Sequence, residues 1–396
     1  MKPQGIRDRV AIVGMGCTPF GERWDVGPDE MLIDATTQAC TSAGVDIKEV
    51  EAFWLGTALS GYSGLALSKP LQLDYRPVTR VENFCATGSD AFRNACYAVA
   101  SGVVDVAMAV GVEKNKDSGV SGVAVPERPN DGTLPWLTGP ALYSFLVPSY
   151  CQKYGVSRED VKEAITHIAW KNHRNGAHNA RAHFRREVSK EAIRRAPKIA
   201  GELGLYDCSG VSDGAAAAIV VRAEDAHRYT PNPLYVKALS LVAGPGAGLS
   251  DTAYDYTTFH EVSRAAEVAY QQAGVTDPGE EIALAEVHDC FTITELILME
   301  DLGLSERGKA WRDVLDGRFD FDGDLPVNAS GGLKSFGHPT GATGLRMLFE
   351  CWGQLRGDVP PERQITTTKR LGLTHNLGGG PGECVSFVGI VGCEPS

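Results

Sequence analysis

The chain has 396 residues and a formal net charge of −12, and 43% of its residues are hydrophobic while 22% are charged. At about 100–200 residues per domain, this length predicts two or three domains or one large duplicated core. The acidic charge argues against a general nucleic-acid binder, and no apolar run reaches the about 18 residues of a membrane span. Because the N-terminus has no apolar signal-peptide segment and the ten cysteines form no CxxC pair, we expect a cytoplasmic enzyme with reduced cysteines.

The first part of the chain alternates strand-like and helix-like segments, as in a sheet built from βαβ units. Strands are predicted at residues 10–16, 52–58, 78–84 and 103–112, and helices at residues 29–43 and 89–101. A proline-rich and then polar stretch interrupts the alternation before a strand at residues 215–221. We therefore predict an N-terminal half from residues 1–117 and 206–230, with a loop domain inserted at residues 118–205.

The same order of elements then repeats, which predicts a C-terminal half at residues 231–396. Its first helix ends in Ala273-Gly274-Val275, which matches Ala43-Gly44-Val45 at the end of the first helix of the chain. Strands are predicted at residues 235–242, 282–287, 327–329, 371–376 and 385–391, and helices at residues 262–273, 292–302 and from 340 onward.

Cys85 stands at a predicted strand-to-helix junction, within Asn83-Phe84-Cys85-Ala86-Thr87-Gly88-Ser89. The partial positive charge and unpaired N–H groups of a helix N-terminus stabilise a thiolate and lower its pKa. The small residues after Cys85 leave room for a ligand. An isolated cysteine of this kind usually only packs in the core, as we expect of Cys96, but the junction favours a nucleophile.

His338 precedes Pro339 at the start of a predicted helix, between glycines that allow a substrate to approach the backbone. A histidine fixed in this way is a candidate general base for Cys85, although a helix-capping histidine fits equally well. His288 and Cys290 follow the strand at residues 282–287, at the edge of the sheet where α/β proteins bind ligands. No second Cys/His pair has ligand spacing, so we predict no metal.

A glycine-rich turn follows His375 and Asn376, and turns of this kind often present N–H groups to anions. Residues 171–198 hold nine basic and two acidic residues. Such a run is usually a solvated helix face, yet in an acidic protein it is also the expected dock for a phosphorylated ligand. The histidines of this region are interpreted as surface or ligand-adjacent residues.

Together and in this order, these segments resemble the thiolase superfamily over nearly the whole chain. The resemblance rests on the Cys85 motif, Ser212-Asp213-Gly214-Ala215-Ala216-Ala217, Gly337-His338-Pro339 and the final glycine loop. The chain looks closest to the sterol-carrier-protein-type and archaeal-type thiolases, which have His-Asp-Cys-Phe where most thiolases have Asn-Glu-Ala-Phe, and His-Asn where most have a cysteine. The family fold is α/β, with duplicated βαβ halves in a five-layered α-β-α-β-α arrangement and an inserted loop domain.

The resemblance implies catalytic roles for four residues. Cys85 would be the nucleophile, His338 its base and Cys290 the second acid/base, while His288 and His338 would stabilise the enolate oxygen. Cys384, beyond the glycine loop, is the alternative to Cys290. The supporting residues would be Gly378, whose N–H would join that of Cys85 in an oxyanion hole, with His375 and Asn376; Arg181, Arg185 and Arg186 would contact the CoA phosphates.

The implied reaction is CoA-dependent thiolytic cleavage of a 3-ketoacyl-CoA, or the reverse Claisen condensation, through an acyl-cysteine. CoA would be a co-substrate, with no covalently bound cofactor. Trp136, Tyr143, Phe145 and Tyr150 would line a roomy acyl pocket for a bulky or aromatic group, although they are also compatible with the core. The alternatives are a thiolase-fold aldolase acting on a β-hydroxyacyl-CoA side chain and a non-catalytic acyl-CoA-binding scaffold. We also expect a homodimer and a small zinc-ribbon/OB-fold partner protein.

Overall fold

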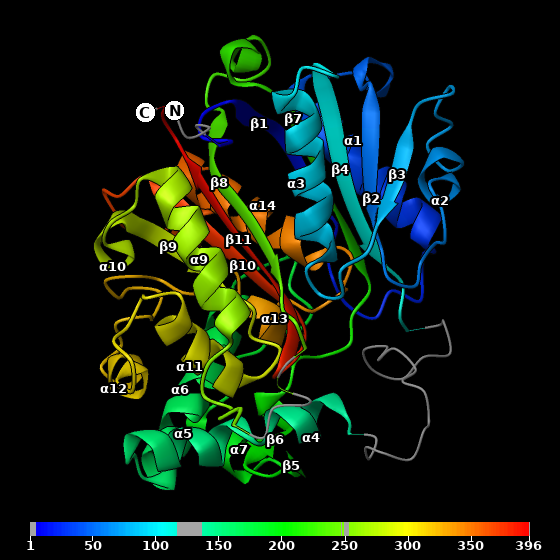
Figure 1. Ribbon diagram of the computed structural model, residues 1–396. Helices are drawn as coiled ribbons and strands as arrows, with labels where there is room; N and C mark the ends of the chain where they lie inside the picture. Colours follow the sequence, from blue (N-terminus) through cyan, green and yellow to red (C-terminus); the bar gives the residue numbers. More distant parts are fainter. Residues whose placement is uncertain (1–4, 117–136, 247, 249–252, 396) are drawn as a thin grey trace.

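The computed structural model describes residues 5–116, 137–246, 248 and 253–395 (Figure 1). Among these residues, nine strands form one sheet in the order β3-β2-β4-β7-β1-β8-β11-β10-β9. The strands are β1 (Val10–Cys17), β2 (Ala52–Gly56), β3 (Val78–Val81), β4 (Val106–Glu113), β7 (Gly214–Arg222), β8 (Leu234–Ala243), β9 (Ile282–Glu286), β10 (Leu371–Gly380) and β11 (Glu383–Gly392). A separate pair joins β5 (Lys198–Ala200) to β6 (Leu203–Gly204).

The sheet consists of two halves with the same topology, which meet where β1 and β8 pair over only two positions. In the first half, β2 runs parallel to β3 and β4, and β7 is antiparallel to β4 and β1. In the second half, β9 runs parallel to β10, and β11 is antiparallel to β10 and β8. Val327 forms a parallel bridge with Ala285 of β9, and this position corresponds to that of β3 beside β2 in the first half. The predicted duplication is therefore confirmed.

The helices complete five layers. Helix α1 (Pro28–Ala43) covers the outer face of the first half-sheet, and α9 (His260–Ala273) covers the outer face of the second. Helices α3 (Thr87–Ala100) and α14 (Thr343–Arg356) pack on each other and contact both half-sheets, so they form the central layer (Figure 1). Glycines bring α1 close to β1, because a Cβ at Gly16 would lie 2.1 Å from Ala35 O.

Residues 137–213, the described part of the segment between β4 and β7, pack beneath the second half-sheet, at the bottom of Figure 1. Its helices are α4 (Gly139–Tyr143), α5 (Leu146–Tyr154), α6 (Arg158–Ala177) and α7 (Lys190–Arg195). They contact α11 (Thr292–Asp301), α12 (Ala310–Leu315) and α13 (Gly332–Ser335). The shorter helices are α2 (Leu65–Ser68), α10 (Pro278–Glu281), η1 (Ile47–Glu49), η2 (Leu205–Asp207), η3 (Ala223–Arg228) and η4 (Pro361–Arg363). The domain boundaries given above stay a prediction.

Two details of the sequence interpretation are wrong. Residues 327–329 form no strand, because the structure gives Val327 only an isolated bridge. Of the histidines interpreted as surface or ligand-adjacent residues, His167 and His173 are buried, so the surface interpretation is wrong for these two. His167 is paired with Asp320 at 2.8 Å, which explains how a polar ring is accommodated there. None of the described helices is both long enough and apolar enough to cross a membrane.

Candidate active site

Cys85 lies in a tight turn between the end of β3 and the start of α3. Phe84, just before it, has a φ of +49°, in the left-handed region that strains a bulky residue. Thr87 fixes the turn, since its hydroxyl accepts a hydrogen bond from Asn83 N (2.8 Å) and donates one to Phe84 O (2.6 Å). The Cys85 side chain retains 9% exposure. The sulfur is therefore presented from a rigid turn without being sealed in the core.

Glycines allow the loop that carries His338 to approach this turn. A Cβ at Gly88 of α3 would lie 2.5 Å from Gly341 O, and one at Gly111 of β4 would lie 2.1 Å from the same oxygen. Any larger residue at either position would push the loop away. The His338 Nε2 atom consequently lies 3.2 Å from the Cys85 Sγ atom, although the two residues are 253 positions apart.

Thr343 sets the orientation and tautomer of His338. Its Oγ1 atom donates to Pro339 O at 2.9 Å, so its single proton is already engaged. The 2.7 Å contact between Thr343 Oγ1 and His338 Nδ1 must therefore be donated by the imidazole. That leaves the Nε2 lone pair facing Cys85. Burial, with a smaller effect of the Arg346 charge, lowers the pKa of His338 to about 3, so the ring is neutral. A neutral imidazole with this tautomer can accept the proton of the thiol.

The electrostatics of Cys85 differ from the sequence prediction of a lowered pKa. Burial raises the pKa of Cys85 to about 12, and the nearby carboxylate of Glu82 adds to the rise. Hydrogen bonds from the N–H groups of Cys85 and Gly379 act in the opposite direction but are weaker. Desolvation of the thiolate thus outweighs the helix N-terminus. The resting pair is a thiol and a neutral imidazole, and the proton moves only when the sulfur bonds to an acyl carbon.

His288 stands at the other side of His338. The two rings have centroids 5.2 Å apart and an interplanar angle of 83°. Burial, followed by the nearby His338 and His375, lowers the pKa of His288 well below its usual range. The Nδ1 atom of His288 is buried and has no hydrogen-bond partner among the described residues. Because an unsatisfied buried nitrogen is costly, this atom is a candidate contact for a substrate oxygen or a water.

Cys290 lies near Cys85, with 8% exposure. Its Sγ atom is 3.8 Å from Thr294 Oγ1, and the Tyr143 hydroxyl lies close enough to lower the pKa of the thiol slightly. Burial, and then the charge of a Cys85 thiolate, raise the pKa of Cys290, so it rests as a thiol. Cys384 has a different environment, because its Sγ atom donates to Glu261 Oε2 at 3.1 Å on α9. This geometry favours Cys290 over Cys384 as the second reacting cysteine.

The glycine loop at the end of β10 approaches the nucleophile. A Cβ at Gly378 would lie 2.6 Å from Asn83 O and 3.1 Å from Cys85 N, so no larger residue fits there. The N–H of Gly379, the next residue, lies close enough to the Cys85 sulfur to lower the pKa of the thiol slightly. Asn376 accepts a 2.6 Å hydrogen bond from Ser89 Oγ, and His375 Nε2 is 3.2 Å from Ser386 Oγ. Both of these side chains therefore brace β10 beside the site.

A buried polar network holds the segment His288–Cys290 from behind. Asp289 accepts hydrogen bonds from Leu333 N (2.5 Å), Lys334 N (3.2 Å) and Asn172 Nδ2 (2.8 Å). Burial, with the nearby charge of Glu295, raises the pKa of Asp289 to about 7. Sequence reasoning missed Asn172 and Thr343. The only sequence signal for Asn172 is that a polar residue interrupts an otherwise buried helix face. The only signal for Thr343 is its position five residues after His338.

The three predicted arginines lie in different environments. The Arg181 guanidinium donates to Cys17 O and lies 5.3 Å from the centre of the Phe349 ring. Arg185 and Arg186 are exposed and line a surface hollow of about 590 Å³. The other lining residues of this hollow are Ala177, His178, Ala180 and His183. His183 N donates to Phe336 O at 3.0 Å, which places the hollow beside the segment that leads to His338.

Cys85, His288 and His338 also form a potential ligand set. One ligand atom from each lies within 4.8 Å of the others, which is compatible with a three-ligand metal site. His338 Nε2 points directly at the sulfur, however, and the Cys85–His338 pair is already a complete nucleophile and base. We therefore interpret the cluster as reacting groups.

Two family models match most of the chain. Residues 10–224 match the model described as "Thiolase, N-terminal domain", and residues 249–388 match "Thiolase C-terminal domain-like". Among curated relatives, an acetyl-CoA acetyltransferase of Methanothermobacter thermautotrophicus is 38% identical, over 93% of this chain and 96% of its own. The benzoylsuccinyl-CoA thiolase subunit BbsB of Thauera aromatica is 29% identical, over 94% and 95% of the two chains.

Solved structures share the fold. A structure named "Ltp2-ChsH2(DUF35) aldolase" has a TM-score of 0.84 at 23% identity and covers 99% of both chains. An acetyl-CoA acetyltransferase of Syntrophomonas wolfei has a TM-score of 0.71 at 18% identity, covering 98% of this chain and all of its own. At these identities the two structures support the fold alone.

Proposed function

The chain belongs to the thiolase family, and from this premise we propose that Cys85, His338 and Cys290 carry out its chemistry. It is an acyltransferase, and its reaction is the CoA-dependent thiolytic cleavage of a 3-ketoacyl-CoA or the reverse condensation. The observation that carries the assignment is the 3.2 Å contact between Cys85 Sγ and His338 Nε2. It gives a buried thiol a neutral base at hydrogen-bond distance.

In the proposed first half-reaction, the Cys85 sulfur attacks the keto carbon of the substrate while its proton moves to His338 Nε2. The C2–C3 bond then breaks, its electron pair stays on C2, and the Cys290 thiol protonates that carbon. The shortened acyl-CoA leaves, and the acyl group remains on Cys85. Charge on the departing enolate oxygen would be stabilised by His288 and His338, and removing one such donor typically costs about 2.7–4 kcal/mol.

In the second half-reaction, the Cys290 thiolate takes the proton of free CoA, whose sulfur attacks the acyl carbon on Cys85. The Cys85–acyl bond breaks, and Cys85 regains its proton from His338. The N–H groups of Cys85 and of the loop at Gly378 and Gly379 would stabilise the two tetrahedral intermediates. The proximity of Gly378 to Cys85 N supports this role, and His375 and Asn376 would keep the loop in place.

CoA would enter past the hollow that Arg185 and Arg186 line. Most of the neighbouring cations are already paired, as in Arg194 with Glu163 and Lys198 with Glu202. No ion pair is found for Arg185 or Arg186 within the described residues, so their charges remain available for phosphate groups. Arg181 would act as a brace for the segment, because its guanidinium is engaged with Cys17 and Phe349.

The predicted aromatic acyl pocket is only partly supported. Tyr150 is fully buried and donates to Glu300 Oε1 at 2.5 Å, so it belongs to the core. Phe145 packs on Tyr256, while Trp136 lies outside the described residues. Of the three aromatics that the structure describes, Tyr143 is the one found beside a reacting cysteine. A bulky or aromatic 3-ketoacyl-CoA therefore remains one arm of a substrate panel, with acetoacetyl-CoA as the other.

Cleavage of this panel should require free CoA and be lost in Cys85→Ser, while Cys96→Ala, a change in a buried cysteine of α3, should keep it. Mass spectrometry of the enzyme mixed with substrate but no CoA should find the acyl group on the Cys85 peptide. Cleavage that needs no CoA and survives Cys85→Ser would instead indicate the aldolase-type reaction. Binding of acyl-CoA without turnover of any panel member would indicate the scaffold role.

We also propose that the chain acts in the cytoplasm as a homodimer with a small partner subunit of the zinc-ribbon/OB-fold type. The relative named BbsB is described as a subunit, and the aldolase structure is named together with ChsH2(DUF35), which supports an association of this kind. Light scattering of the purified chain, alone and after co-expression with candidate partners, tests both expectations. A monomer that gains neither mass nor activity with any partner would contradict them.

A further inference from the structure

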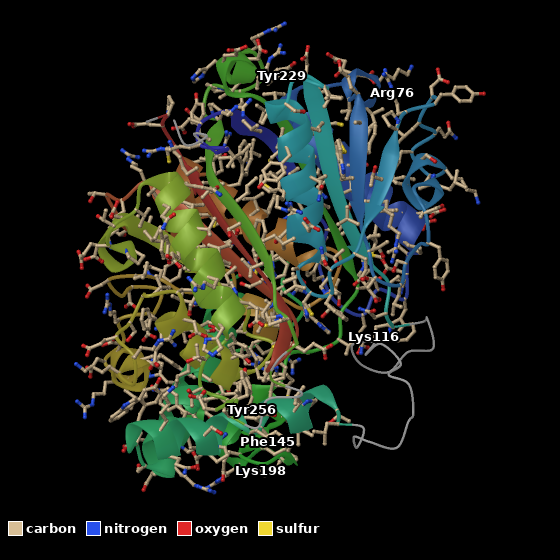
Figure 2. The ribbon with its side chains drawn as sticks, viewed as in Figure 1. Arg76, Lys116, Phe145, Lys198, Tyr229 and Tyr256 are labelled. Atoms are coloured by element: carbon tan, nitrogen blue, oxygen red, sulfur yellow. The ribbon has the colours of Figure 1, made fainter. Side chains whose placement is uncertain are left out.

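Helix α4 of the segment between β4 and β7 inserts a tyrosine next to the reacting cysteines. Tyr143 is 4% exposed, and its ring centroid lies 4.6 Å from that of Phe291, the residue after Cys290. Its hydroxyl donates to Gly379 O at 2.9 Å. Two residues further on, Phe145 packs on Tyr256 at 5.7 Å between ring centroids, and Figure 2 shows the two side chains together below the second half-sheet. This contact anchors the end of α4.

The Tyr143 hydroxyl connects the two cysteines through Gly379. Gly379 has a φ of +96°, in the region that favours glycine, and its N–H approaches the sulfur of Cys85. Its carbonyl oxygen is the acceptor of the Tyr143 hydroxyl. The same hydroxyl interacts with the Cys290 thiol. The Tyr143 hydroxyl therefore bonds to the loop that faces Cys85 and lies close enough to Cys290 to affect the pKa of its thiol.

We infer that Tyr143 is a positioning residue that holds the Gly379 loop against Cys85 and donates a hydrogen bond to Cys290 when this cysteine becomes a thiolate. The inference rests on the proposed function, because that function makes Cys290 the acid/base. The hydroxyl is the feature that a phenylalanine at this position would lack.

The proton arithmetic of the hydroxyl supports this role. A phenol has one proton to donate and two lone pairs to accept with. With Cys290 as a thiol, the Tyr143 proton goes to Gly379 O, and the S–H can point at the tyrosine oxygen. When Cys290 loses its proton, the O–H can rotate toward the anionic sulfur, and a charge-assisted hydrogen bond is stronger than a neutral one. Burial raises the pKa of Tyr143, so the phenol keeps its proton throughout.

The other groups that face Cys290 are two acids and one further donor. Cys85 and Asp289 are acids whose anions raise the pKa of Cys290. Thr294, on the helix that follows Cys290, has its Oγ1 atom 3.8 Å from the sulfur and also lowers the pKa of Cys290. Tyr143 is thus a donor that comes from outside the Cys290 segment. The acid/base chemistry of Cys290 therefore depends on how α4 packs against the site.

The test measures the Cys290 thiolate directly, in a Cys85→Ala background that removes the competing nucleophile. Alkylation of Cys290 by iodoacetamide is followed by peptide mass spectrometry between pH 7 and 10. Adding Tyr143→Phe should slow the alkylation of Cys290 about tenfold at each pH, because loss of one hydrogen bond to a charged group lowers the thiolate fraction by about that factor. Tyr143→Met, which also lacks the hydroxyl, should give the same change if the phenylalanine variant folds poorly.

Tyr270→Phe is the matched control, because Tyr270 is a largely buried tyrosine whose hydroxyl donates to Leu302 O at 2.6 Å, away from both cysteines. It should leave Cys290 alkylation unchanged. With Cys85 intact, Tyr143→Phe should move the pH profile of kcat to higher pH, with a smaller effect on KM. Equal alkylation rates in Tyr143→Phe and its parent would overturn the inference. If the unmodified enzyme showed no thiolysis while Tyr143→Phe still slowed the alkylation of Cys290, the proposed function would be refuted. The hydrogen bond from Tyr143 to the Cys290 thiolate would still be supported.

Discussion

Thr343 controls the protonation state of His338 through one hydroxyl group. The Thr343 Oγ1 atom lies 2.7 Å from His338 Nδ1 and gives its own proton to Pro339 O, so the imidazole must place its hydrogen on Nδ1. The opposite nitrogen is then free to face Cys85. A base oriented in this way depends on the group that accepts the hydrogen bond from its other ring nitrogen, because that bond fixes the tautomer and the ring orientation.

Replacing Thr343 with valine should therefore reduce kcat about 10- to 100-fold, because a buried N–H without an acceptor costs about 1–3 kcal/mol. The ring can avoid that cost by turning or by changing tautomer, and either change removes the lone pair from the sulfur. Thr343→Ser keeps the hydroxyl and should retain most of the activity. Equal kcat values for the valine and serine variants would contradict the role assigned to the hydroxyl.

The reactivity of Cys85 should reflect its raised pKa. Because burial moves the pKa of this thiol to about 12, the fraction present as thiolate should increase about tenfold per pH unit across the neutral range. Carbamidomethylation of the Cys85 peptide should follow that slope between pH 7 and 9.5, and acyl-CoA should protect it. An alkylation rate that is already constant above pH 7 would indicate an ion pair with His338 instead.

Much of the fold could be predicted from the pattern of apolar runs, because strands covered on both faces and a repeated order of elements leave a clear signal. The Cys85 and His338 motifs also indicate their chemistry, since small residues follow Cys85 and a glycine directly precedes His338. The pKa of Cys85 could not be predicted in the same way. A helix N-terminus is visible in the sequence, whereas the desolvation that outweighs it arises from side chains distant in the chain.

The bracing residues were hidden for a similar reason. Tyr143 was grouped with Phe145 and Tyr150 because all three are aromatic and close in sequence, yet only the fold shows that their environments differ. Asn172 is an ordinary polar position within a helix until α6 is seated against Asp289. Tertiary contacts of this kind carry no local sequence signature.

Removing the charge of Arg185 and Arg186 should weaken CoA binding. Each is an exposed cation, and contacts of that kind contribute about 0.2–1 kcal/mol. The double substitution to alanine should therefore raise the KM for CoA about two- to thirtyfold while kcat changes little, and the effect should shrink as salt is added. Arg194→Ala, at a residue paired with Glu163, is the control. An unchanged KM for CoA in the double variant would show that the CoA phosphates bind at other residues.

Zinc should inhibit the enzyme, because Cys85, His288 and His338 hold neutral imidazoles and a thiol with ligand atoms within 4.8 Å of one another. Zn²⁺ would displace the thiol proton and occupy the nucleophile. Micromolar Zn²⁺ should thus inhibit competitively with acyl-CoA, and EDTA should restore the rate. Since the proposed mechanism uses no metal, EDTA alone should leave the rate of the purified chain without its zinc-ribbon partner unchanged, and a loss of activity on chelation in this preparation would contradict the mechanism.

His173 should make the protein less stable in mild acid. Both of its ring nitrogens are buried without a hydrogen-bond partner among the described residues, and burial lowers its pKa from 6.5 to about 3. Between these two values the unfolded chain binds a proton that the folded chain does not, so the free energy of unfolding falls as the pH drops below 6.5. At pH 5 the cost is about 2 kcal/mol, at 1.36 kcal/mol per pH unit.

His173→Leu removes this titration, so the free energy of unfolding in urea should fall less between pH 7 and 5 in this variant than in the unmodified protein. His178→Leu, a change at an exposed histidine, should leave the slope as it is, and an equally steep fall in the His173 variant would show that the imidazole is solvated in the folded state.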